Sequence, residues 1–260
     1  MTLAQPGVRR YAGLWLLALL LPVMASAAAV FVNVDPAMWW SMPASMKRGL
    51  TGDALLFIAG AIVLAAPVAG VVVAASGRAG RERDGASGAL PAAWPLTAAV
   101  AIFVGASAML TVIWWGLSDA DALRFVATSH ATLFAVTLAL SAFGALCGAT
   151  FTDALDAVGC SLTIVLVAAG GLLVAGAALA DVPRALIDVA LTASPFVTMA
   201  SASHIDVMRM GVPYQMSPLA HLQVAYPSWY VASGWYLALA GLCFLGVRWK
   251  TRSWQSTTVN

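Results

Sequence analysis

The sequence predicts an all-α integral membrane protein with six transmembrane helices and a broken, re-entrant helical element before the last helix. Of its 260 residues, 62% are hydrophobic and only 9% are charged, and the mean hydropathy is +0.89. Soluble domains carry about 25% charged residues, so this composition excludes a water-soluble enzyme. The net charge of +2 is too small to form a basic face, and we therefore expect no nucleic-acid partner.

Six apolar stretches have the length that a membrane span requires, which is about 20 residues for roughly 30 Å of hydrocarbon. They cover residues 11–32, 54–75, 96–117, 125–150, 158–179 and 229–247, and none contains Lys, Arg, Asp or Glu. The first stretch is longer than the 7 to 15 apolar residues of a secretory signal, so we interpret it as a retained span. Residues 1–260 then form a single transmembrane domain.

A seventh stretch, residues 185–203, decides the topology. It is mostly apolar but contains Asp188 and, at its centre, Pro195. With six spans, the cations on the cytoplasmic side are Arg9, Arg10, Arg78, Arg81, Arg83, Arg248, Lys250 and Arg252, and those outside are Lys47, Arg48, Arg124, Arg184 and Arg209. The excess of cations on the cytoplasmic side satisfies the positive-inside rule. If the seventh stretch crossed the membrane, this excess would disappear. We therefore predict a multi-pass protein of the cell (cytoplasmic, or inner) membrane with both termini cytoplasmic, in which residues 185–203 fold back at Pro195 within an external re-entrant segment, 180–228.

The one substantial cytoplasmic loop, residues 76–95, carries a cluster of both charge signs. Its members are Arg81, Glu82, Arg83, Asp84 and Gly85. One interpretation is a solvated loop whose arginines touch anionic membrane lipid. The other is a charged helix start presented to a protein partner, which the mixed signs favour.

All three histidines fall in the predicted external half, and two of them form a candidate metal site. His204, Asp206 and His221 could supply two imidazoles and a carboxylate to copper, zinc or iron. No two histidines have a local metal-binding spacing, so an interfacial histidine that only forms hydrogen bonds is the competing interpretation. The chain contains no nucleophile motif and no P-loop, and the thiols of Cys147, Cys160 and Cys243 lie in apolar runs without zinc spacing.

Two regions of the sequence resemble one family. The external segment contains, in order, Ser194-Pro195-Phe196, His204-Ile205-Asp206, Tyr214-Gln215-Met216-Ser217-Pro218 and Tyr226-Pro227-Ser228-Trp229. This order, followed by a last span and a basic tail, resembles the C-terminal region of type-2 ABC exporter permeases. Residues 82–87 are similar to the string E-R-E-x-G-T that the family places after its second span, with Asp84, Ala86 and Ser87 in place of Glu, Gly and Thr.

The resemblance implies a non-enzymatic permease subunit that exports an unidentified, lipid-like or amphipathic substrate. Its partners would be an ABC ATPase subunit, which binds ATP and magnesium, and a second permease copy or homologous permease in a homo- or heterodimer; this chain itself would hold no cofactor. The residues implied for coupling to the ATPase are Arg81, Glu82, Arg83, Asp84 and Gly85, and those of the re-entrant element are Pro195, His204, Asp206, Tyr214 and Pro218. The alternatives are a subunit of a copper-dependent, monooxygenase-like membrane metalloenzyme that uses His204, Asp206 and His221, and a purely structural subunit of a larger membrane complex.

Overall fold

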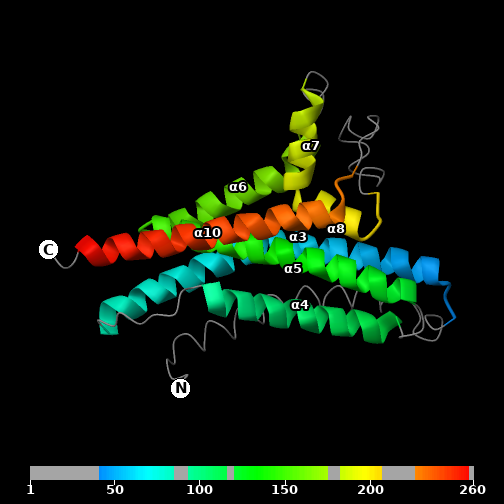
Figure 1. Cartoon of the computed structure of the whole chain (residues 1–260), viewed down its shortest axis with the longest axis horizontal. Coiled ribbons are helices and arrows are strands. Elements are labelled where there is room, and N and C mark those ends of the chain that lie inside the picture. The colour runs from blue at the N-terminus through cyan, green and yellow to red at the C-terminus, as the bar shows by residue number, and fades with distance from the viewer. Residues whose placement is uncertain (1–40, 85–92, 116–119, 175–181, 207–225, 258–260) are drawn as a thin grey trace.

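The computed structural model describes residues 41–84, 93–115, 120–174, 182–206 and 226–257, and these ranges are helical with no strand (Figure 1). The helices are α3 (Ala44–Asp84), α4 (Ala93–Trp115), α5 (Ala120–Thr150), α6 (Ala154–Val174), α7 (Arg184–Ala193), α8 (Pro195–Ala202) and α10 (Trp229–Thr257). The predicted all-helical class is confirmed. The predicted first span, 11–32, lies outside the described residues.

Five of these helices are long and apolar enough to cross a membrane, namely α3, α4, α5, α6 and α10. They correspond to the second to sixth predicted spans. The pair α7–α8 passes the same test only when its two helices, which are bent by 79°, are taken together. The structure is therefore that of a multi-pass membrane protein, and its described ranges hold five such helices, or six if the bent pair counts as one.

Helix α3 is longer than the span predicted at 54–75, because it begins at Ala44 and continues to Asp84. Residues 76–84 of the predicted loop 76–95 are thus helical, residues 85–92 lie outside the described ranges, and the last residues of that loop belong to α4. The reason is that Lys, Arg and Glu are good helix formers. A change from apolar to charged residues marks the edge of a span without ending the helix.

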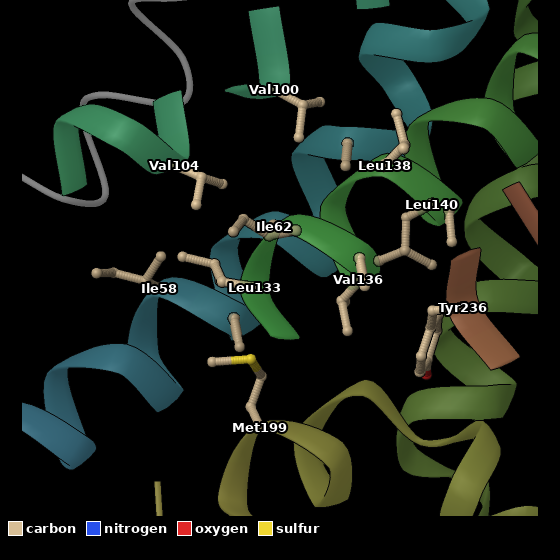
Figure 2. Close-up of a cluster of buried hydrophobic side chains, with 14 of the residues drawn as sticks. Ile58, Ile62, Val100, Val104, Leu133, Val136, Leu138, Leu140, Met199 and Tyr236 are labelled. Atoms are coloured by element: carbon tan, nitrogen blue, oxygen red, sulfur yellow. The ribbon is translucent and has the colours of Figure 1, made fainter. Parts of the chain in front are cut away.

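Helix α5 lies at the centre of the bundle and packs against α3, α4, α6, α8 and α10. Figure 2 shows the main core cluster, in which Leu133, Val136, Leu138 and Leu140 of α5 meet side chains of its neighbours. Those neighbours are Ile58 and Ile62 of α3, Val100 and Val104 of α4, Met199 of α8 and Tyr236 of α10. Large apolar side chains on the outer surfaces of α6 and α10 remain exposed, as expected where lipid takes the place of water.

Helices α3, α5 and α10 run in the same direction. On α5, Ser141 lies against Gly70 of α3, and Gly148 lies against Val71, one residue further along that helix. The hydroxyl of Ser233 on α10 donates to Thr132 Oγ1 in the first half of α5 (3.1 Å), and Leu146 near the end of α5 contacts Gly246. Helices α4 and α6 return in the opposite direction (Figure 1).

The bundle therefore has two distinct ends. The α8 end contains the first residues of α3, α5 and α10 together with α7 and α8, and the Arg78 end contains the last residues of α3, α5 and α10. Helix α6 finishes at the α8 end, and α10 begins there. The bent pair α7–α8 thus starts and finishes at the same end of the bundle.

Candidate functional site

The break between α7 and α8 lies where the sequence predicts it, at Ser194-Pro195. Helix α7 ends at Ala193, Ser194 has an extended backbone (φ −80°, ψ 118°), and Pro195 is the first residue of α8. Proline disfavours a helical conformation in the residue before it, and it is well tolerated at the first helical position, where its missing N–H costs nothing. The dipeptide therefore ends one helix, starts the next and allows the 79° bend.

Helix α8 is inserted into the bundle rather than lying on its surface. Six of its eight residues are buried: Pro195, Val197, Thr198, Met199, Ala200 and Ala202. The ring of its Phe196 packs against Gly60 of α3, and Met199 points into the core cluster (Figure 2). A helix this short is unstable alone, so contacts with α3, α5 and α10 hold it in place.

Side-chain hydroxyls form hydrogen bonds to backbone carbonyls at the break and on the neighbouring helix. The phenol of Tyr236 on α10 donates to the carbonyl oxygen of Ala193 (2.7 Å), and Ser194 Oγ donates to the carbonyl oxygen of Ala169 on α6 (3.2 Å). Thr198 Oγ1 donates to the carbonyl oxygen of Thr192 (3.3 Å). In hydrocarbon, an unpaired backbone carbonyl costs several kcal/mol, so hydroxyls placed in this way make irregular backbone tolerable at membrane depth.

The far end of α8 is closed by hydrogen bonds and by packing. Ser129 Oγ on α5 donates to the carbonyl oxygen of Ala202 (3.3 Å), and Ser201 Oγ donates to that of Pro227 just before α10 (2.6 Å). The chain then leaves through a Schellman motif, in which the N–H of Ile205 donates to Ala200 O (2.9 Å). We call Ser129, Ser194, Thr198, Ser201 and Tyr236 the polar collar of α8.

His204 and Asp206, predicted as site residues, both have structural contacts here. His204 adopts the left-handed conformation (φ 54°) at the position after the helix cap where glycine is usual, and its side chain is exposed. The carboxylate of Asp206 accepts a hydrogen bond from the hydroxyl of Tyr226 (2.7 Å). The remaining predicted site residues Tyr214 and Pro218, and the alternative ligand His221, lie outside the described residues.

No group of three or more His, Cys, Asp or Glu side chains within the described ranges is placed to hold a metal ion. Because His221 is outside those ranges, the proposed set of His204, Asp206 and His221 stays an untested prediction. The three thiols are free, and Cys147 and Cys243 are buried.

The predicted coupling residues Arg81, Glu82, Arg83 and Asp84 form the last turn of α3, and Gly85 lies outside the described residues. One turn earlier, the guanidinium of Arg78 donates to carbonyl oxygens at the C-terminal end of α5. From the sequence, Arg78 counted only as one cytoplasmic cation. Its partners are about seventy residues away, so no local signal could identify them.

A second buried polar cluster joins α4 to α5 around His130. Its Nδ1 lies 2.9 Å from the carbonyl oxygen of Val126, and its Nε2 lies 3.1 Å from the hydroxyl of Ser107. Because a carbonyl oxygen only accepts, Nδ1 carries the proton and Nε2 accepts from Ser107. Both ring nitrogens of His130 therefore have a polar partner, and the hydroxyl of Thr111 donates to the carbonyl oxygen of Ser107 (2.8 Å).

Comparison of the chain with models of known protein families, with curated proteins and with solved structures finds no match. The features that bear on function are therefore the path of the chain through the bundle, the polar collar of α8 and the charged last turn of α3.

Proposed function

We propose that this chain is the transmembrane permease subunit of an ATP-driven ABC exporter and is not itself an enzyme. The observation that carries the proposal is that α10 runs parallel to α3 and α5, with α7–α8 starting and finishing at one end of the bundle. This path supports a re-entrant element before the last of six spans, which is the topology that the resemblance to type-2 permeases implies. A crossing α7–α8 would require α10 to run antiparallel to α5.

The aromatic residues of α10 support its placement across a bilayer. Tyr230 near its start and Trp249 near its end are 64% and 78% exposed. At 1.5 Å per residue, the two positions are about 29 Å apart along the helix, close to the hydrocarbon thickness of roughly 30 Å. Aromatic rings favour the headgroup layers, and the exposed leucines Leu237, Leu239, Leu242 and Leu245 lie between them.

The distribution of cations supports the orientation. Among the described residues, the Arg78 end contains Arg78, Arg81, Arg83, Arg248, Lys250 and Arg252, and the α8 end contains Lys47, Arg48, Arg124 and Arg184. By the positive-inside rule, the Arg78 end faces the cytoplasm and α7–α8 faces outward. The last turn of α3, residues 81–84, then points toward a cytoplasmic ATPase. In this proposal the ATPase binds ATP and magnesium, and a second permease copy lies beside this chain.

The buried polar residues support a cargo that is lipid-like or amphipathic. Within the described ranges, these residues are serines, threonines and one histidine, and none is a carboxylate or a Lys or Arg cation. Ion-coupled carriers generally place ionisable groups on the ion pathway. Hydroxyl groups on otherwise apolar helices are better suited to a substrate with a large apolar part.

Two measurements test the proposal. In a variant without the native cysteines, Arg184→Cys on α7 should react with a membrane-impermeant maleimide in intact cells. Asp153→Cys in the α5–α6 turn should react only after permeabilisation. Labelling of Asp153→Cys from outside would contradict the orientation, as would external proteolysis of a tag placed after Asn260.

The second measurement is co-isolation with an ATPase when the chain is expressed with its neighbouring genes. The double charge reversal Glu82→Lys, Arg83→Glu should abolish co-isolation. The control Lys250→Glu, at the same end of the bundle on α10, should retain it. Absence of an ATPase from the wild-type preparation would contradict the proposal.

A further inference from the structure

The guanidinium of Arg78 fastens the end of α3 to the end of α5. Nη1 donates to the carbonyl oxygens of Phe151 (3.0 Å) and Thr152 (3.5 Å), and Nη2 donates to those of Phe151 (3.0 Å) and Gly148. Carbonyls in the last turn of a helix lack intrahelical partners and carry the negative end of the helix dipole. The planar fork of arginine can bind several of them at once, which the single ammonium group of lysine cannot do.

In the stretch next to this contact, at Pro67–Val71 of α3 and Ser141–Gly148 of α5, the backbones of the two helices touch directly. A Cβ atom on Gly70 would overlap the carbonyl oxygen of Ser141, and one on Gly144 would overlap the carbonyl oxygen of Pro67. With no side chain between the backbones at these positions, the two helices have no flexible layer there that could absorb a relative shift. Rotation or sliding of one against the other would bring backbone atoms into collision.

At the opposite end, α8 rests on both members of this pair. The side chain of Ile205 fills the space over Gly52 on α3, and Phe196 packs on Gly60, about two turns further along. From α5, Ser129 Oγ donates to the carbonyl oxygen of Ala202. The distance along α3 from Gly52 to Arg78 is about 39 Å at 1.5 Å per residue, so this one helix connects α8 with the Arg78 end.

We propose that α3 and α5 move as one body, and that Arg78 is the positioning residue that fastens the two helices to each other at the Arg78 end of the bundle. A displacement of residues 81–84 at this end would then reach α8 at the other end. The inference rests on the proposed function, since it takes the displacement to come from an ATPase. If Arg78 only stabilised the fold, its loss would lower stability without changing how α8 responds to nucleotide.

The test uses spin-label distances in the complex isolated with its ATPase, in a background without native cysteines. One label pair, Leu64→Cys on α3 and Leu123→Cys on α5, reports on the pair itself; both side chains are exposed. The other, His204→Cys after α8 and Leu166→Cys on α6, reports on movement of α8. A non-hydrolysable ATP analogue should leave the 64–123 distance unchanged and shift the 204–166 distance.

Arg78→Gln should abolish the nucleotide-dependent shift in the 204–166 distance while the ATPase stays bound and hydrolyses ATP. Arg248→Gln, a matched change of an exposed arginine at the same end of the bundle, should retain the shift. Arg78→Lys keeps the charge but loses the planar guanidinium, so it should reduce the nucleotide-dependent shift in the 204–166 distance. This variant replaces Arg78→Gln in the test if Arg78→Gln does not fold. The inference is overturned if the 64–123 distance changes with nucleotide, or if the Arg78 variants respond as the wild type does.

If no ATPase accompanies the wild-type chain, the proposed function fails, and the pairing of α3 with α5 is still measurable. In the isolated chain, Arg78→Gln should broaden the 64–123 distance distribution, and Arg248→Gln should not. Equal distributions in the two variants would overturn the fastening role of Arg78.

Discussion

The hydroxyl of Tyr236 on α10 donates a 2.7 Å hydrogen bond to the carbonyl oxygen of Ala193, the last residue of α7. The two residues are 43 positions apart, and the bond ties the last span to the break before α8. Tyr236 is 5% exposed and belongs to the core cluster, so its ring is fixed and its hydroxyl is directed at one acceptor (Figure 2). The broken element is thereby held by side chains from outside itself.

We predict that Tyr236→Phe lowers the free energy of unfolding by about 1 kcal/mol, because the ring stays in place while the Ala193 carbonyl loses its partner. The measurement is unfolding in mixed detergent and SDS micelles, followed by circular dichroism. Tyr230→Phe is the control, since Tyr230 lies on the same helix and is 64% exposed. An equal loss in both variants would show that the bond to Ala193 contributes nothing.

The close approach of α3 and α5 predicts opposite effects of alanine at two glycines of α3. Gly70→Ala should destabilise by ~1–3 kcal/mol, because its Cβ would overlap the Ser141 carbonyl and force the helices apart. Gly77→Ala should be neutral or stabilising by up to ~1 kcal/mol, since nothing lies within 4 Å of its Cβ position and alanine favours a helix. The same unfolding measurement checks both, and a tolerated Gly70→Ala would refute the direct backbone contact.

The helices could be predicted from the sequence because their signals are local. Length and apolar character suffice to find α4, α5, α6 and α10, and the Ser194-Pro195 dipeptide suffices to find the break, since proline restricts its own neighbour. The ends of α3 could not be found in this way. Outside the apolar stretch, residues up to Asp84 stay helical because helix propensity, and not hydropathy, determines where the helix ends.

The contacts of the candidate site were beyond prediction because they join distant parts of the chain. Arg78 meets carbonyls 70 to 74 residues away, and Ser129 meets Ala202 across 73 residues.

His204 illustrates a different failure. A histidine beside an aspartate suggests a ligand set, and nothing in the residue type reveals that its backbone closes a helix in the left-handed conformation.

The buried imidazole of His130 predicts a loss of stability when its hydroxyl partner is removed. Ser107→Ala should lower the free energy of unfolding by about 1 kcal/mol, because Nε2 would keep only the Thr111 hydroxyl, at 3.5 Å, whose proton is directed to the Ser107 carbonyl. The control is Thr163→Ala on α6, an exposed residue whose hydroxyl bonds only within its own helix. Similar values for the two variants would mean that the hydroxyl–imidazole contact does not hold α4 to α5.

The backbone of His204 predicts that glycine is a better residue than histidine at this position. The left-handed conformation costs roughly 1 kcal/mol for a residue with a Cβ and little for glycine, so His204→Gly should raise the free energy of unfolding by up to ~1 kcal/mol. His204→Val should lower it, since a β-branched side chain fits a positive φ worst. Metal analysis of the purified variants separates this role from that of a ligand: a more stable His204→Gly protein with the metal content of the wild type is expected. Loss of stoichiometric copper or zinc in that variant would instead establish His204 as a ligand and favour the metalloenzyme interpretation.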